Sequence, residues 1–481
     1  MLMPMPMLLD LPRRRVRRAL IVAGLAGGCL AAPSSTGSAH PDPYTPPWFP
    51  SDETVRAMLA SRVEAGQAVG LVVGMIEGGQ PRVVSYGKSN GPYERPLDGA
   101  TVFEIGSVTK VFTCTLLADM ARRGEVRLDQ PVAELLPKTV HVPSRGDTLI
   151  RLVDLATQSS GLPRLPTNFA PADPANPYAD YSASRLYDFL SHHTLTRAPG
   201  ASYEYSNLGM GLLGHALALR SGKSYEAILT ERVLKPLRMM DTRITLTEEM
   251  GSRFAAGHDL SGAIVPHWEL TALAGAGALR STANDMLTFL AANLDSNATA
   301  ISADLRATHA ARRPAGSPNM RIGLAWHRLS TADAEIVWHN GGTGGFRSFV
   351  GFDPVRQVGV VVLSNASGNV DDIGLHLLNP RLPLEEFTKH IDATIDPKGL
   401  DALVGRYSLA ANFVMTVTRE GDNLFIQATG QQKFQVYPTS DSTFYYRVVP
   451  AEVTFHRDAL GKAFEIVLRQ GSRDVSGKRV P

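Results

Sequence analysis

Cysteine and net charge are both scarce in this sequence. Only Cys29 and Cys114 occur among 481 residues, which excludes a framework of several disulfides and a metal site built from cysteines. The formal net charge is +2, so no nucleic acid or other polyanion is expected as a partner. The metal motif His-Glu-x-x-His is absent, and His192 and His193 are adjacent, a spacing that suits no helical ligand pair. We therefore expect neither a metal nor another cofactor.

The amino terminus has the pattern of a secretory signal peptide. Residues 1–39 hold five arginines and one acid, a net charge of +4 (five minus one), and the run "ALIVAGLAGGCLAA" that follows is short for a membrane span. We expect residues 1–39 to be removed on export to a bacterial periplasm or the medium. "AGGC", ending at Cys29, resembles a lipoprotein processing site, but Ala26 stands where leucine is usual, so lipid anchoring is the less favoured interpretation.

A chain of this length has room for two or three domains, and the pattern of expected helices and strands changes near residue 400. The proline-rich residues 40–50 read as a linker. Residues 51–385 begin with a strand hairpin around Gly78-Gly79, continue with amphipathic helices and end with strands, which predicts one α+β domain with an antiparallel sheet. Residues 396–478 form short strands about ten residues apart, which predicts a small all-β domain, a barrel or a sandwich.

The stretch "FEIGSVTKVFT" places Ser107 and Lys110 three residues apart before an apolar helical run. On a helix these positions share a face, so the lysine amine would lie beside the serine hydroxyl and help to remove its proton. Ser-x-x-Lys is a common pattern, and Ser85 and Lys88 form a second copy at the end of a strand. Taken alone, either copy is more simply a helix cap with a solvated lysine.

Two further stretches carry matching chemistry. "YEYSNLGMG" places Tyr205 and Asn207 at the start of another helix, and "VWHNGGTGGF" places His339 before a glycine-rich strand end. The order Ser-x-x-Lys, Tyr-x-Asn, basic-x-Gly resembles the penicillin-recognising serine enzymes, and the tyrosine motif resembles their class C β-lactamase branch. The resemblance runs from about residue 55 to 378. It implies a β-lactamase-like fold, an antiparallel sheet with helices on both faces and a helical insert.

The resemblance also implies roles for these residues. Ser107 would attack a carbonyl, and Lys110 and Tyr205 would share the general-base work, with the pKa of Tyr205 lowered by the nearby ammonium. Asn207 would hold Lys110 and the substrate amide, and the backbone NH groups of Ser107 and Gly342 would form an oxyanion hole. The expected catalytic residues are Ser107, Lys110 and Tyr205, and the expected substrate-binding residues are Asn207, His339, Asn340, Gly341 and Gly342.

The third motif departs from the usual β-lactamase pattern, because His339 stands where lysine is usual and Asn340 where threonine is usual. A histidine with a pKa near 6–7 would be a weaker anchor for a substrate carboxylate. His-x-Gly is similar to D-alanyl-D-alanine carboxypeptidases of the AmpH type and to esterases of this branch. We expect an exported serine acyl hydrolase acting on β-lactams or peptidoglycan peptides of the D-Ala-D-Ala type. A carboxylesterase, or a penicillin-binding sensor that acylates without turnover, is the alternative. Peripheral membrane association and the oligomeric state are left open.

Overall fold

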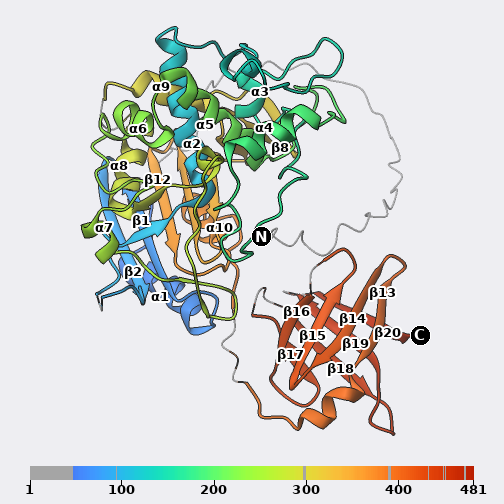
Figure 1. Cartoon of the computed structure of the whole chain (residues 1–481). Coiled ribbons are helices and arrows are strands. Elements are labelled where there is room, and N and C mark those ends of the chain that lie inside the picture. The colour runs from blue at the N-terminus through green and yellow to red at the C-terminus, as the bar shows by residue number, and fades with distance from the viewer. Residues whose placement is uncertain are drawn as a thin grey trace, which may run out of the picture. The chain divides into compact units, whose positions relative to one another are not determined.

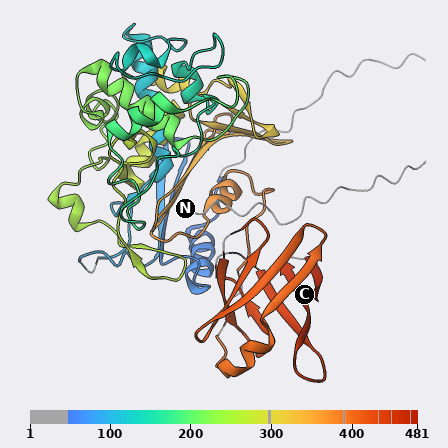
Figure 2. The same cartoon turned by 45° about the vertical axis from the view of Figure 1, so that its right-hand side comes forward.

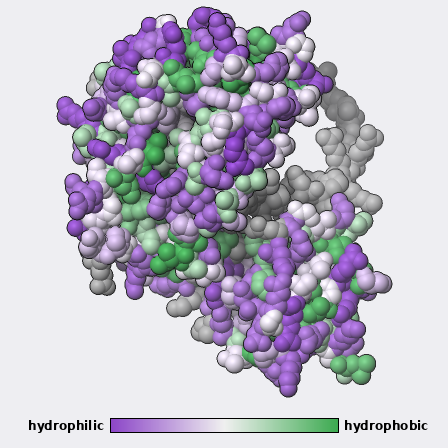
Figure 3. All heavy atoms as spheres, in the orientation of Figure 1, coloured by the Kyte–Doolittle hydropathy of each residue, from purple (hydrophilic) through white to green (hydrophobic). Residues whose placement is uncertain are grey.

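The computed structural model describes residues 47–481 except 94, 296–298, 388, 389, 391, 432, 448, 450, 471 and 472. The expected signal peptide at 1–39 and most of the linker at 40–50 lie outside the described residues. Within the described ranges, no helix is both long and apolar enough to cross a membrane. The face drawn in Figure 3 is mostly polar, with apolar residues scattered over it.

One antiparallel sheet of eight strands, in the order β2-β1-β12-β11-β10-β9-β8-β7, organises the first part of the chain (Figure 1). Its strands are β1 (Gly70–Glu77), β2 (Gln80–Gly87), β7 (Arg313–Ala315), β8 (Ser317–Ile322), β9 (His327–Ser330), β10 (Glu335–Gly342), β11 (Arg347–Asp353) and β12 (Val358–Ser364). Two short pairs join β3 (Val102–Glu104) to β6 (Arg280–Thr282) and β4 (Gly257–His258) to β5 (Ile264–Val265).

The strand pairing confirms the arrangement that the sequence predicts. Gly78 and Gly79 both have positive φ and form the two-residue turn between β1 and β2, with Glu77 opposite Gln80. Strand β1 then pairs with β12, so early and late segments lie side by side and enclose the helical insert. Strand β8 was not expected from the sequence, because it lies near the sheet edge, is largely exposed and lacks an apolar alternation.

Helices cover both faces of this sheet, as expected. The helices are α1 (Asp52–Glu64), α2 (Thr109–Arg122), α3 (Leu152–Ala156), α4 (Ala183–His192), α5 (Asn207–Ser221), α6 (Tyr225–Leu229), α7 (Glu248–Ser252), α8 (Ala283–Asn293), α9 (Ser302–His309) and α10 (Asp371–Leu378). Shorter turns are η1 (Gly106–Val108), η2 (Val132–Leu135), η3 (Thr230–Leu234), η4 (Ala274–Ala276) and η5 (Pro397–Ala402). A Cβ on Gly359 would contact α8, whereas one on the neighbouring strand at Gly351 would contact α10, so these two helices lie on opposite faces.

Helix α2 lies in the middle of the hydrophobic core. All its residues from Thr109 to Met120 are buried, which explains why its sequence is apolar around most of its circumference. Phe112 stacks on Phe289 of α8 with ring centroids 4.3 Å apart, and Phe289 stacks in turn on Trp326. The core therefore fixes α2, and with it the side chains at the amino-terminal end of this helix.

The carboxy-terminal part is a closed antiparallel barrel (Figure 2). Its strands are β13 (Gly405–Ala410), β14 (Phe413–Glu420), β15 (Asn423–Ala428), β16 (Lys433–Pro438), β17 (Thr443–Tyr445), β18 (Ala451–Arg457), β19 (Ala463–Gln470) and β20 (Arg473–Val480). Tyr407, Phe444 and Phe455 are buried in it and pack edge to face. The pairing of β13 with β20 closes the barrel. The sequence did not indicate these two strands, and β20 is largely polar and exposed.

We predict that a chain ending at residue 395 folds without the barrel. The strands of the large sheet come from residues 70–364 and those of the barrel from residues 405–480, so each ladder is complete by itself among the described residues. Circular dichroism should show one cooperative thermal transition for the shortened protein. If the shortened protein is unfolded under all conditions, the domain boundary is wrong.

Candidate active site

Ser107 lies in the turn η1, between the end of β3 and the start of α2. Gly106 before it has φ of +48°, a left-handed conformation that glycine adopts without strain. The turn leads directly into the buried helix, whereas the serine itself is partly exposed. The local fold thus presents one hydroxyl to solvent from a rigid base.

Lys110 is fully buried and lies beside this serine, as the sequence predicts. Its Nζ donates to Ser107 Oγ at 2.9 Å and to the carbonyl oxygen of Ala276 in η4 at 2.6 Å. Burial, and after it the charge of Arg164, holds the pKa of Lys110 well below its ordinary range. A neutral amine in contact with a serine hydroxyl can accept the proton of that hydroxyl.

Tyr205, from the segment that precedes α5, completes this cluster. The Lys110 Nζ lies 4.9 Å from the centroid of its ring, and its hydroxyl is hydrogen-bonded to Ser107. Burial raises the pKa of Tyr205, and the bond to Ser107 offsets this only in part. The expectation of a lowered tyrosine pKa is therefore wrong, because loss of hydration outweighs the nearby cation. A tyrosine with a raised pKa keeps its proton at neutral pH, so Lys110 is the better candidate for the base.

Strand β10 brings its two glycines against the turn η1. A Cβ on Gly106 would lie 2.7 Å from the backbone nitrogen of Gly342, and a Cβ on Gly341 would overlap the carbonyl of Ile105. Ser348 of the adjacent strand donates to the same carbonyl at 2.8 Å. The backbones of η1 and β10 are thus in direct contact, which places the NH groups of Ser107 and Gly342 in the region expected for an oxyanion hole.

His339 lies near this site, but not as a charged group. It is fully buried. The centroid of its ring lies 6.3 Å from that of Tyr205 and 5.2 Å from that of His327. Its Nδ1 lies 2.6 Å from the Asn340 carbonyl oxygen, so Nδ1 carries the proton. Burial, then His327 and Lys110, lowers the pKa of His339 well below its ordinary range. The expected pKa near 6–7 is wrong, because burial removes the hydration of the imidazolium and the nearby Lys110 repels its charge.

Two of the expected substrate-binding amides have other partners. Asn340 follows His339 on a strand, so its side chain points to the opposite face, where it donates to Asp371 Oδ2 of α10 at 2.5 Å. Asn207 Nδ2 donates to the Tyr178 hydroxyl at 3.3 Å, and its Oδ1 is buried without a hydrogen-bond partner in the described structure. The expected bond between Asn207 and Lys110 is therefore absent there, since Lys110 is held by Ser107 and Ala276 instead.

The second Ser-x-x-Lys copy forms no comparable cluster. Ser85 lies on β2 and donates to the Leu97 carbonyl at 2.6 Å, and Lys88 is exposed.

Sequence reasoning missed two neighbours of the Ser107 cluster, Arg164 and Tyr178. Both come from the long connection between α3 and α4, and nothing in their spacing marked them. Within the residues that the structure describes, no group of three or more acids, histidines or cysteines could hold a metal ion.

Comparisons with known proteins identify the family of the chain. The family description "Beta-lactamase" matches residues 55–378, and "Domain of unknown function (DUF3471)" matches residues 389–479. The D-alanyl-D-alanine-carboxypeptidase/endopeptidase AmpH of Escherichia coli (strain K12) is 30% identical over 359 residues, which are 71% of this chain and 91% of that protein.

Solved structures give the same result. A class C beta lactamase from Rhodobacter sphaeroides aligns with a TM-score of 0.59 and 26% identity, covering 69% of this chain and 98% of that one. A beta-lactamase/D-alanine carboxypeptidase from Yersinia pestis aligns with a TM-score of 0.57 and 27% identity, covering 66% and 94%. The fold, together with the matched family and relatives, defines the chain as a serine hydrolase. The chain belongs to the beta-lactamase family.

We predict that Gly106→Ala lowers kcat/KM for p-nitrophenyl butyrate by about 10²-fold, because the added methyl group displaces the oxyanion donors. Its nearest atoms belong to the backbone of Gly342 and cannot rotate away. Gly124→Ala is the matched control, since Gly124 has φ of +74° and open space around its Cβ position. It should share the backbone strain and keep the activity. Equal activity of both variants would contradict the role of this contact.

Proposed function

We propose that this protein is an exported serine acyl hydrolase that forms an acyl-enzyme at Ser107 with β-lactams or D-Ala-D-Ala-type peptides. The observation that carries the proposal is the buried Lys110 amine, 2.9 Å from the Ser107 hydroxyl and with a lowered pKa. The names of relatives support the substrate class, since they include a D-alanyl-D-alanine-carboxypeptidase and beta-lactamases. The arginine-rich amino terminus supports export, which the amino-terminal sequence of periplasmic protein would check.

Acylation uses three side chains. The neutral Lys110 amine takes the proton of Ser107 as Oγ bonds to the substrate carbonyl carbon. The bond from that carbon to the leaving nitrogen or oxygen then breaks. Tyr205, protonated at rest, gives its proton to the leaving group and recovers one from Lys110. Its contact with Ser107 and its position under the Lys110 amine suit both transfers. The NH groups of Ser107 and Gly342 stabilise the oxyanion between the two steps, and each donor contributes about 3 kcal/mol.

Deacylation reverses the roles. A water molecule bonds to the acyl carbon and loses its proton toward Tyr205 and Lys110, and Ser107 Oγ leaves with a proton. Asn207 Oδ1 is buried, unpartnered in the described structure and close to Tyr178, so it is free to accept a hydrogen bond from a substrate amide. We propose this substrate contact for Asn207 in place of the expected bond to Lys110.

A carboxylesterase is the second candidate, and His339 is the observation that favours it. A neutral, buried imidazole offers no charge to a substrate carboxylate, so β10 gives anionic peptides no advantage over neutral esters. Comparison of kcat/KM for nitrocefin, for D-alanine release from a D-Ala-D-Ala peptide and for p-nitrophenyl butyrate separates the candidates. One equivalent of released product without turnover would instead indicate a penicillin-binding sensor.

We predict that Ser107→Ala abolishes covalent labelling by fluorescent penicillin or a fluorophosphonate, because the nucleophile is lost. Ser85→Ala is the matched control, since it removes the serine of the other Ser-x-x-Lys copy. In-gel fluorescence of the purified proteins measures the labelling. Labelling that persists in Ser107→Ala would contradict the whole assignment.

The pH profile of kcat/KM should follow the base. Only the neutral Lys110 amine accepts a proton, so activity should rise with pH through the lowered pKa of Lys110 and then stay level. His339 should add no decline between pH 6 and 7, because it is neutral across that range. Steady-state kinetics from pH 5 to 9 at fixed ionic strength check this with one neutral ester and one anionic β-lactam. A decline through pH 6–7 seen only with the β-lactam would show that His339 is charged and binds the anion.

A further inference from the structure

Arg164 is held beside the candidate nucleophile by the start of α5. Its carbonyl oxygen accepts from the backbone nitrogens of Asn207 at 3.1 Å and Leu208 at 3.2 Å. Its guanidinium carbon lies 5.1 Å from the centroid of the Tyr205 ring, the same ring that the Lys110 amine approaches. The side chain is partly exposed, so a molecule bound at Ser107 can reach it.

The guanidinium of Arg164 forms no ion pair and no side-chain hydrogen bond with any residue that the structure describes. This distinguishes it from other arginines around the same loops. Arg313 donates to Asp154 at 2.6 Å, and Arg197 bonds to Glu204. A partly buried cation that lacks a counter-ion is unfavourable, and the cost is recovered when an anion binds to it.

The neighbours of Arg164 do not supply that anion. The described groups that interact electrostatically with Lys110 or Tyr205 are Arg164, Cys114, Tyr203, Tyr178, His327 and His339, and no carboxylate is among them. The described surroundings of Ser107 thus hold two cationic side chains, Lys110 when protonated and Arg164 always. Bidentate pairing with a carboxylate is the strongest interaction that a guanidinium forms in such a place.

We propose that Arg164 binds a carboxylate of the substrate and makes the enzyme prefer anionic acyl compounds to neutral ones. It takes the part that the sequence assigned to His339, but from the loop that follows α3 and not from strand β10. The proposal rests on Ser107 being the nucleophile, as proposed above. The carboxylate belongs either to the acyl part of the substrate or to its leaving group, and the experiment separates these two.

Three matched chromogenic esters test the proposal. They are p-nitrophenyl pentanoate, which is neutral, mono-p-nitrophenyl adipate, with a carboxylate on the acyl side, and 3-carboxy-4-nitrophenyl pentanoate, with one on the leaving group. The quantity compared is the ratio of kcat/KM for each anionic ester to that for the neutral ester at one pH. This ratio cancels any effect of Arg164 on Lys110 that all substrates share.

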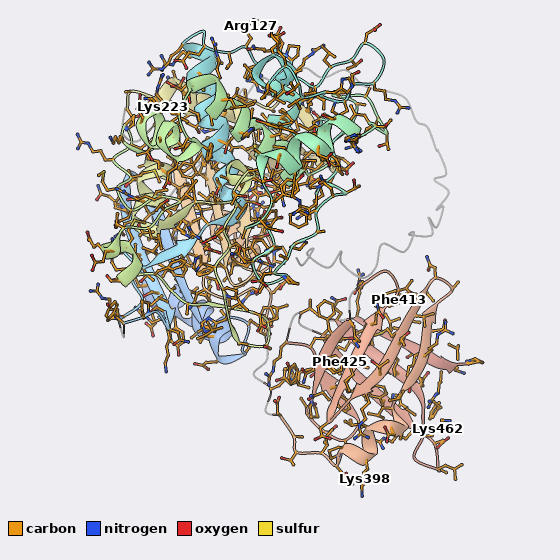
Figure 4. The ribbon with its side chains drawn as sticks, viewed as in Figure 1. Arg127, Lys223, Lys398, Phe413, Phe425 and Lys462 are labelled. Atoms are coloured by element: carbon orange, nitrogen blue, oxygen red, sulfur yellow. The ribbon has the colours of Figure 1, made fainter. Side chains whose placement is uncertain are left out.

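Arg164→Ala should lower the ratio for one anionic ester about 10- to 100-fold, whatever change in rate it causes equally for all three esters through Lys110. The ester affected tells on which side the carboxylate binds. Arg164→Lys keeps the charge and should retain part of the ratio. Arg127→Ala is the control, since Arg127 is exposed on the hydrolase part, pairs with Asp129 and is labelled in Figure 4.

Other results overturn the proposal. If Arg164→Ala lowers all three rates equally, Arg164 only positions the site, and if it changes none, Arg164 binds nothing there. If the Arg164→Ala variant does not fold, the Arg164→Lys variant tests the proposal instead. Lysine displaces the charge and must weaken the pairing with a carboxylate. A kcat/KM ratio equal to that of wild type at both high and low salt therefore also overturns the proposal. Failure of the proposed function looks different, because wild type would then hydrolyse none of the esters and would not be labelled.

Discussion

Burial of the Lys110 amine against the Ser107 hydroxyl is the constraint on which the site depends. A lysine on an exposed helix stays protonated and cannot accept a proton at neutral pH. Here the core encloses the whole first half of α2, and loss of hydration shifts the amine toward its neutral form. The Ala276 carbonyl in η4 satisfies one of its hydrogens, so the buried amine is not an unpaired donor. The hydrophobic core therefore both places the base and sets its charge.

Much of this could be predicted from the sequence because it depends on local geometry. Residues three apart on a helix share a face, and the turn η1 leads directly into α2, so the sequence could predict that Ser107 and Lys110 lie together. A Gly-Gly pair between two apolar runs predicts a hairpin, and the hairpin forms. The positions of Tyr205 and Gly342 beside Ser107 came from the motif order, and the structure brings them to the same place.

The rest could not be predicted, because it depends on which distant segments share a neighbourhood. The pKa of Tyr205 is raised and that of His339 lowered by the degree of burial, which sequence alone does not give. Arg164 and the Ala276 carbonyl reach Lys110 only after the loops fold over α2. Strands β8 and β20 were not predicted for a related reason. Their residues are mostly polar and exposed, so they lack the alternation of apolar residues that indicates a strand.

The charges around Ser107 also explain why a histidine suits position 339. A lysine there would place another cation beside Lys110, with no carboxylate among the interacting groups described to offset the repulsion. It would also lose its own charge to burial, because position 339 is fully buried. A neutral imidazole avoids both effects, because its Nδ1 donates to the adjacent carbonyl. A fixed guanidinium on the loop, which stays charged when partly buried, is the chemically better place for the one permanent cation of such a site.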